Sequence, residues 1–352
     1  MSALAVFPWP GGEGAWSDAG RGSVLDAPVE VGTRRSVKIR DDDVEPPIVS
    51  ATARSMGGTV GVHVRPLDGG MTAATAAGRA AGFVLSRIDA WAGRLTRFST
   101  TSDLARLNAS ADARVPVRPT LAAVLDWARQ AEDLSDGIVD VALLEARLGA
   151  ESGSGATVRA MASRQWSLDR GPRGAHVRRG AGLRFDLDGV AKGWLADRAL
   201  ARLDAFPAAV VDADGDIAIR LGHGQRWRFG VADPRMRGVD LVEIDLVGSD
   251  RGGGRRFGLA TSGTSIHRWV HDGHLSHHLI DPRTGRSAVT DVVQATVLGP
   301  TARVAEALAK TAVILGSDAA LVSLERPGVD GAILLTDHGE LLVTPRTLRW
   351  LA

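Results

Sequence analysis

The sequence contains no cysteine and no long apolar run. The absence of cysteine excludes disulfides, thiolate metal ligands, a cysteine nucleophile and a lipid-modified N-terminal cysteine. No apolar stretch approaches the roughly 18 residues that a membrane-spanning helix needs. The start, MSALAVFPWPGGEGAW, carries no basic leader and is broken by two prolines, so it does not resemble a secretory signal. We therefore expect no membrane span and a cytoplasmic location.

An excess of charge of one sign is also missing. The formal net charge is +1, and no dense basic run occurs. This balance gives no support for nucleic-acid binding. The apolar fraction of 44% and the charged fraction of 24% are ordinary for a soluble globular protein. The composition therefore indicates a globular protein whose 352 residues allow one large domain or two.

Lysine is scarce, since only three of the 42 Lys and Arg residues are lysines: Lys38, Lys192 and Lys310. Arginine carries a wide planar guanidinium, whereas the lysine ammonium is compact and fits a tighter site. A lysine kept among so many arginines therefore marks a place where only the smaller cation fits, or it is there by chance. Lys38 lies in a polar N-terminal stretch, for which chance is the simpler account.

Hydrophobic periodicity divides the chain into an arm and one folded region. Residues 1–50 are rich in Gly, Pro, Asp and Arg and lack periodicity, so we predict a mostly disordered arm. Helical spacing predicts helices over 72–95, 119–134, 188–203, 301–315 and 317–325, with Thr120 and Thr301 as N-caps. Strands are predicted over 54–64, 164–168, 175–178 and 183–187, and in several runs between 208 and the C-terminus. Segregated helices and strands favour an α+β fold over residues 51–352.

Three acidic, glycine-rich turns are candidate ligand-binding segments: SDGIVD (135–140), FDLDGVAKG (185–193) and VDADGDI (211–217). Glycine lets backbone N–H groups approach a phosphate, and a helix N-terminus favours negative charge. Each stretch taken singly is also ordinary turn chemistry. Lys192 in the first turn of a predicted helix makes 188–193 a candidate site for an anionic ligand. No Walker-type or GxGxxG motif is present.

The segment 265–285 is rich in histidine and holds His267, His271, His274, His277 and His278. Clustered imidazoles bind metals or move protons. Neighbouring residues of a strand point to opposite faces, so one of His277 and His278 is expected to face inward beside Asp281. A single inward histidine is more often a hydrogen-bonding residue than a catalyst.

The segment AEALAKTAVILG (305–316) carries Glu306 and Lys310 four residues apart on a predicted helix. The apolar stripe of that helix is Val304, Leu308, Ala312 and Leu315, so the pair lies on another face. From periodicity alone, the simplest account is a solvated salt bridge worth some tenths of a kcal/mol.

Eight segments, in one order, together resemble the ApbE family, the FAD:protein FMN transferases. They are SMGGTVGVHV (55–64), FSTTSDLARLN (98–108), SDGIVDVALL (135–144), FDLDGVAKGWLADRA (185–199), VVDADGDIAIRLG (210–222), LATSGTSIHRW (259–269), HHLIDPRTGRS (277–287) and AEALAKTAVILG (305–316). The resemblance implies an ApbE-like fold of mixed or antiparallel sheets flanked by helices, with FAD bound in a cleft between lobes. It also implies an enzyme that cleaves FAD with Mg²⁺ assistance and attaches FMN to a Thr or Ser of an acceptor protein.

The resemblance assigns roles by position. FAD-contacting positions are Met56, Phe98, Ile138, Val139, Asp140, Asp186, Lys192 and Leu279. The catalytic histidine is His278, as the base for the acceptor hydroxyl. The metal positions are the backbone carbonyl of Gly189 and the side chains at 306 and 310.

Two metal positions depart from the family pattern, which has Asp and Thr where this chain has Glu306 and Lys310. A glutamate can still bind Mg²⁺, but a protonated lysine cannot ligate a metal. Either Lys310 replaces the metal as the positive group near the pyrophosphate, or the ion binds elsewhere through the substrate phosphates. Thr264, Ser265 and Asp214 also differ from the family residues.

Three functions follow from these residues. The first is FMN transfer from FAD to a protein hydroxyl, with release of AMP. The alternative is an FAD-binding protein or an FAD pyrophosphatase that yields FMN and AMP without efficient protein transfer, because the metal pair is altered. The third is an interaction protein without ligand binding, which the combination of Lys192, Met56 and His278 disfavours.

Overall fold

The computed structural model describes residues 5–7, 37–40, 47–154, 165–172, 174–249, 254–271 and 274–352. The predicted N-terminal arm, residues 1–50, lies mostly outside these ranges. Its described parts include two short strands, β1 (Ala5–Phe7) and β2 (Val37–Arg40). The strand β3 (Val49–Ser55) begins at its end.

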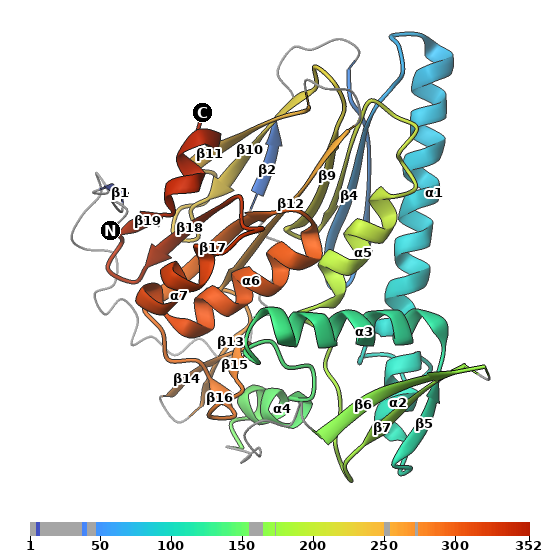
Figure 1. Ribbon diagram of the computed structural model, residues 1–352, viewed down its shortest axis with the longest axis vertical. Helices are drawn as coiled ribbons and strands as arrows, with labels where there is room; N and C mark the ends of the chain where they lie inside the picture. Colours follow the sequence, from blue (N-terminus) through green and yellow to red (C-terminus); the bar gives the residue numbers. More distant parts are fainter. Residues whose placement is uncertain are drawn as a thin grey trace, which may run out of the picture.

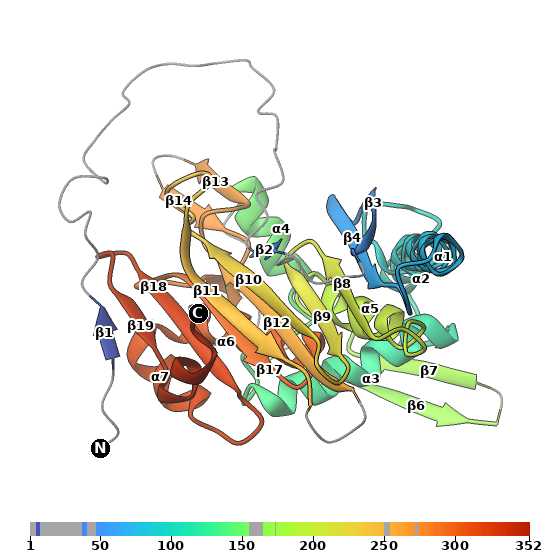
Figure 2. The ribbon, with the colours of Figure 1, turned by 90° about the horizontal axis from the view of Figure 1, so that it is seen from above.

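One sheet of nine strands forms the centre of the fold (Figure 1, Figure 2). Its order is β1-β19-β18-β17-β12-β9-β8-β4-β3, and every neighbouring pair is antiparallel. The other members are β4 (Gly58–Arg65), β8 (Ala208–Ala213), β9 (Asp216–Leu221), β12 (Arg255–Gly263), β17 (Val292–Gly299), β18 (Gly331–Thr336) and β19 (Leu341–Val343). All six residues of β8 are buried. A strand whose sequence reads AAVVDA without polar alternation is covered on both faces.

Helices cover one face of this sheet (Figure 1). The helix α1 (Met71–Leu95) packs on β3 and β4, α5 (Ala191–Leu200) on β8 and β9, and α6 (Ala302–Leu315) on β12 and β17. The remaining helices are α2 (Asp103–Ala109), α3 (Pro119–Leu134), α4 (Leu144–Ser152) and α7 (Ser317–Leu324). The predicted long amphipathic helices and the α+β class with antiparallel sheets are therefore confirmed.

One of the two predicted helix caps is correct. The Thr301 side chain accepts a hydrogen bond from the Val304 N–H at 3.4 Å at the start of α6. Thr120 does not cap α3. That helix begins one residue earlier, at Pro119, whose missing N–H needs no partner at the first helical position, and Arg118 is the N-cap residue.

A smaller sheet covers the opposite face of the central one (Figure 2). It consists of β11 (Asp240–Val247), β10 (Arg226–Ala232) and β2. Its aromatic residues Trp227 and Phe229 are buried against β8 and β9. The final 3₁₀ helix, Pro345–Trp350, adds Trp350, whose ring meets Phe257 edge to face at 5.6 Å. The molecule is thus layered as helices, sheet and sheet.

The remaining strands form three small sheets. These are β5 (Arg114–Val117), β6 (Trp166–Gly171) and β7 (Gly174–Arg179), then β13 (Arg268–His271) with β14 (His274–His277), and β15 (Ile280–Asp281) with β16 (Arg286–Ser287). The strand predicted over 183–187 is wrong, because that segment is irregular. Asn108 takes the place of a partner strand, since its side chain accepts from the Phe185 N–H and donates to the Phe185 carbonyl, both at 2.8 Å.

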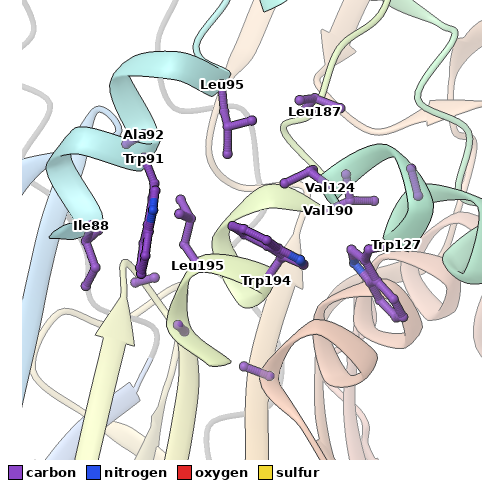
Figure 3. Packing of buried hydrophobic residues seen from close by; sticks show 14 of the residues in the cluster. Ile88, Trp91, Ala92, Leu95, Val124, Trp127, Leu187, Val190, Trp194 and Leu195 are labelled. Atoms are coloured by element: carbon purple, nitrogen blue, oxygen red, sulfur yellow. The ribbon is translucent and has the colours of Figure 1, made fainter. Parts of the chain in front are cut away.

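Tryptophans pack the junction of α1, α3 and α5 (Figure 3). Trp91 of α1 and Trp194 of α5 meet edge to face with ring centroids 6.4 Å apart. Leu187 and Val190, just before α5, are buried in the same core. The start of α5 and the residues preceding it are thereby fixed from behind, which leaves their polar side chains to face the opposite way.

Candidate active site

A pocket lies where the segment before α5, the β8–β9 turn, the end of β12 and the helix α6 meet. Its lining includes nine of the twelve residues to which the resemblance assigns a role: Ile138, Asp140, Asp186, Gly189, Lys192, His278, Leu279, Glu306 and Lys310. These residues are spread over more than 170 positions of the chain, yet the fold brings them to one place. Met56, Phe98 and Val139 are not among the described residues that line it.

The segment 185–190 alternates between core and pocket. Phe185, Leu187 and Val190 are buried in the core, whereas Asp186, Asp188 and Gly189 line the pocket. The Asp186 N–H donates to the Val141 carbonyl at 2.8 Å, which joins this segment to 138–142. The DGVAKG turn therefore presents its carboxylates and glycine to one side because its apolar residues are held on the other.

The β8–β9 turn supplies Asp214 and Asp216. Asp214 has φ +60°, a left-handed conformation that favours glycine, which is the residue that the resemblance implies at this position. Its carboxylate fills the space beside Gly58, where a Cβ would overlap it. Asp216 is buried, and its Oδ2 lies 3.5 Å from Lys192 Nζ. The rare Lys192 is thus an inward cation held by a buried carboxylate.

Glu306 and Lys310 face the pocket, so the solvated salt bridge expected from periodicity is wrong. Glu306 is 6% exposed, and its Oε2 accepts a hydrogen bond from the Gly193 N–H at 3.0 Å. Lys310 is half-buried and lies against Gly189. The helical pattern could not show that α5 covers this side of α6. Their contact is close, because a Cβ on Gly193 would lie 2.7 Å from the Ala302 backbone.

Two adjacent histidines have different surroundings. His277 is the inward one expected from alternation: it is 7% exposed, and its Nε2 lies 2.9 Å from the Ala288 carbonyl. His278 lines the pocket, and its Nδ1 is buried without a hydrogen-bond partner in the described part of the chain. A free imidazole nitrogen in a pocket is available to accept a proton.

Two of the pocket residues that were not assigned a role from the sequence lie close to His278. His267 has φ +53°, and its ring meets that of His278 edge to face at 5.4 Å. Arg147 of α4 donates to the His278 carbonyl at 3.0 Å and to Glu151 at 2.7 Å, and its guanidinium lies 3.5 Å from Asp188. The composition gave no signal for Arg147, because arginine is common in this chain, and the helix α4 that carries it was not predicted. His267 stood in the recognised histidine-rich segment.

The three predicted residues outside the lining lie in segments that adjoin lining residues. Val139 is buried next to Ile138 and Asp140, and its N–H donates to Ser135 Oγ at 2.9 Å. Met56 occupies the β3–β4 turn with φ +56°, another left-handed residue. Phe98 is 83% exposed under the guanidinium of Arg97, and that guanidinium lies 4.0 Å from Asp186.

Burial and charge separate the ionisation of the pocket residues. Burial lowers the pKa of His278 well below its usual range. The positive charges of Arg147 and Lys310 add to this effect, and Asp188 opposes it. At neutral pH the imidazole is therefore uncharged.

The pKa values of the neighbouring lysine and carboxyl groups are raised instead of lowered. Burial disfavours the charge on Lys192, but Asp216 and other nearby carboxylates outweigh it and raise the lysine pKa. Burial raises the pKa of Asp216 to about 6, against the pull of Lys192. Burial, and then the charge of Asp216, raise the pKa of Glu306 well above its usual range. A cation is thus retained while Glu306 favours its neutral form.

The residues at the implied metal position do not fit a divalent ion. Mg²⁺ prefers six oxygen ligands in octahedral geometry. Among the residues that the structure describes, no three His, Asp or Glu side chains converge to hold a metal. Glu306 Oε1 is buried without a hydrogen-bond partner within these ranges, but it is a single oxygen. The Lys310 ammonium beside Gly189 would repel the ion.

None of the helices within the described ranges combines the length and the apolar character that crossing a membrane requires.

Known proteins resemble this chain in sequence. The FAD:protein FMN transferase of Treponema pallidum is 34% identical over 170 residues, which cover 45% of this chain and 45% of that protein. In that alignment the chain spans less than half the length of its relative. The FAD:protein FMN transferase of Haemophilus influenzae is 26% identical over 318 residues, which cover 84% of this chain and 89% of that protein.

Solved structures share the fold. The ApbE protein of Thermotoga maritima has a TM-score of 0.71 and 21% identity, covering 87% of this chain and 100% of that chain. The apo form of the flavinyl transferase ApbE of Pseudomonas stutzeri has a TM-score of 0.67 and 21% identity, covering 86% and 96%. The family model described as ApbE family matches residues 56–333. Because this match includes most of the sequence and the fold agrees, the chain belongs to the ApbE family.

Proposed function

We propose that this protein transfers the FMN half of FAD to a Thr or Ser hydroxyl of an acceptor protein and releases AMP. The observation that carries the proposal is the pocket itself. It sets the uncharged imidazole of His278 beside the cations Lys192, Lys310 and Arg147. A base and positive charge are what phosphoryl transfer to a hydroxyl requires. Relatives named FAD:protein FMN transferase support the same activity.

FAD binding is assigned by the resemblance and supported by the pocket. Lys192 lies at the start of α5, where its ammonium and the helix N-terminus favour the pyrophosphate. Ile138 and Leu279 supply apolar lining, and Asp140 and Asp186 supply acceptors for the hydroxyl and ring N–H groups of FAD. The backbone at Val139 belongs to the same segment.

The flavin ring is proposed to reach the exposed side of the pocket. Phe98 is exposed in a position to stack on an aromatic ring, and Arg97 links it to Asp186. Met56 at its hairpin turn offers a polarizable side chain for the same ring. These two residues are thus proposed to contact FAD outside the pocket lining.

The reaction begins when His278 takes the proton of the acceptor hydroxyl. The hydroxyl oxygen attacks the phosphorus on the FMN side of the pyrophosphate, and the bond from that phosphorus to the bridging oxygen breaks. AMP leaves with the bridging oxygen, and FMN remains joined to the acceptor through a phosphoester. The proton on His278 then passes to the leaving phosphate or to solvent. Lys192 offsets negative charge throughout.

The second candidate function is FAD hydrolysis to FMN and AMP. The altered pair Glu306 and Lys310 favours it, because a changed cation site could leave pyrophosphate cleavage intact while impairing acceptor transfer. In that case water takes the place of the acceptor hydroxyl in the same step.

The experiment uses purified protein, FAD and an acceptor with a Thr in a motif of small residues. Covalent flavin is read from fluorescence of the acceptor on a denaturing gel. The wild type should label the acceptor, and His278→Gln should lose at least 100-fold in rate while still binding FAD. Equal labelling of the acceptor by His278→Gln would show that His278 is not the base. Free FMN without labelled acceptor would favour hydrolysis.

A further inference from the structure

Lys310 is the pocket cation that has no protein partner within the described ranges. Within the ranges that the structure describes, its Nζ forms no hydrogen bond and no ion pair. The other cations are held: Lys192 by Asp216 at 3.5 Å, and Arg147 by Glu151 and the His278 carbonyl at 2.7 and 3.0 Å. A compact ammonium that lines a pocket without a protein partner is available to an anionic ligand.

The position of this ammonium depends on Gly189. A Cβ at residue 189 would overlap Lys310 Nζ and lie 2.8 Å from Lys310 Cδ. The side chain therefore crosses from α6 to the backbone of the segment before α5 and lies along it. An arginine fork would be wider than this space. The geometry accounts for a lysine at this position in a chain whose cationic residues are mostly arginines.

Lys310 also lies among the groups that the proposed reaction uses. Its charge acts on Asp188, on His278 and on Glu306. A pyrophosphate placed against His278 and Lys192 therefore comes within the field of Lys310. Unlike a divalent ion, this cation is covalently attached and needs no ligands of its own.

Three carboxylates of the pocket each have a protein partner, although Glu306 Oε1 has none within the described ranges. Asp216 pairs with Lys192, Glu306 Oε2 accepts from the Gly193 N–H, and Asp214 Oδ1 accepts from the Thr59 N–H at 3.4 Å. They do not converge on one point within the described ranges. Within the described ranges the pocket thus holds Lys192 through a carboxylate, leaves the Lys310 ammonium for a ligand, and offers no set of side chains for a metal.

We propose that the Lys310 ammonium replaces the divalent ion in this protein, so that FAD binds and its pyrophosphate is cleaved without added metal. This inference rests on the proposed function, because it concerns the same pyrophosphate. It goes beyond that function, because the positive charge comes from a side chain of this protein and not from a bound ion.

The test measures FAD affinity by calorimetry in EDTA and in Mg²⁺, and the rate of AMP release with the acceptor protein, which should likewise agree between the two conditions. Wild type should bind FAD with dissociation constants that agree within threefold, and Mg²⁺ alone should give no binding heat. Lys310→Met should weaken FAD binding at least tenfold, and Mg²⁺ should not restore it. Arg79→Met is the matched control, since it removes one positive charge from an exposed site on α1.

A double variant tests the exchange directly. Glu306→Asp with Lys310→Thr restores the residue types that the resemblance implies for a metal pair, so FAD binding should now weaken at least tenfold in EDTA and recover in Mg²⁺. Circular dichroism checks that each variant is folded. If a variant is not folded, the wild-type comparison in EDTA and Mg²⁺ decides.

The outcomes separate the inference from the function. Wild-type binding that weakens tenfold or more in EDTA overturns the role of Lys310 and leaves the proposed function standing. A folded Lys310→Met that binds FAD like the wild type in EDTA also overturns it. Absence of FAD binding under both conditions contradicts the proposed function itself.

Discussion

At the scale of single residues, the pocket places opposite demands on its titratable groups. His278 is driven toward its neutral form and Lys192 toward its charged form, although they line one pocket. The difference arises from what each faces. Carboxylates surround the lysine, whereas burial and neighbouring cations act on the imidazole. The same cavity can therefore hold an anion and present a base.

The ionisation of His278 can be measured in the ligand-free protein. Its folded pKa is lowered, so the imidazole should stay uncharged at pH 6.5, where an unperturbed histidine is half protonated. Nuclear magnetic resonance of ring-labelled histidine follows this, with His278→Gln to assign the signal. Titration at or above pH 6.5 would contradict the account. As pH falls, the histidine takes up a proton in the unfolded state before it does so in the folded state. The free energy of unfolding should therefore decrease as pH falls from about 7 toward the folded pKa of His278.

Gly189 should tolerate no side chain without loss of ligand binding. In Gly189→Ala the new Cβ overlaps Lys310 Nζ, so the flexible lysine must move. We expect FAD affinity to fall about tenfold, with a change in unfolding free energy of less than roughly 1 kcal/mol. Gly82→Ala is the control, because a Cβ there meets nothing within 4 Å. Calorimetry and urea unfolding give the two readouts, and unchanged FAD affinity in Gly189→Ala would refute the contact.

At the scale of elements, periodicity predicted the long helices because their buried faces recur every three to four residues. It failed at 183–187 for a physical reason. Leu183, Phe185 and Leu187 alternate as in a strand, but the alternation separates core from pocket rather than two faces of a sheet. The partner is a side chain, Asn108, which no local pattern indicates.

Asn108 should stabilise this segment measurably. Asn108→Ala removes both hydrogen bonds to Phe185 and leaves two backbone groups unsatisfied, so unfolding free energy should fall by about 1–3 kcal/mol. Asn108→Asp keeps the acceptor for the Phe185 N–H but sets a carboxylate oxygen against the Phe185 carbonyl, so it should also be less stable than the wild type. Urea unfolding checks both losses, and FAD affinity should follow them. Equal urea midpoints for the wild type and Asn108→Ala would show that the two hydrogen bonds of Asn108 contribute nothing to stability.

At the scale of the whole molecule, the site is a meeting place of distant segments. No single segment of the sequence predicted it, because Asp186, His278 and Lys310 come together only when α5 and α6 pack on the sheet. The order of eight motifs identified the family, which the comparisons confirm, and nine of its implied site residues line one pocket. The contact between Lys310 and Gly189 depends on how closely α6 packs against the segment before α5, and no local sequence pattern indicates that distance.

Ligand binding should stabilise the whole fold through the phosphates. At FAD concentrations 100-fold above the dissociation constant, stability should rise by about 2.7 kcal/mol, and the melting temperature should rise with it. Riboflavin at the same concentration as FAD should give a smaller shift, because it lacks the phosphates that Lys192 and Lys310 would meet. Thermal unfolding with each ligand checks this. An equal shift with riboflavin would mean that the flavin ring alone is recognised.

The most direct measurement of the central claim is the ratio of acceptor-bound flavin to released AMP in one reaction with FAD. Mass spectrometry of the acceptor gives the first quantity and chromatography the second. Our account predicts a ratio near one for the wild type and loss of both products in His278→Gln. AMP release with FMN free in solution and no flavin on the acceptor would contradict protein transfer.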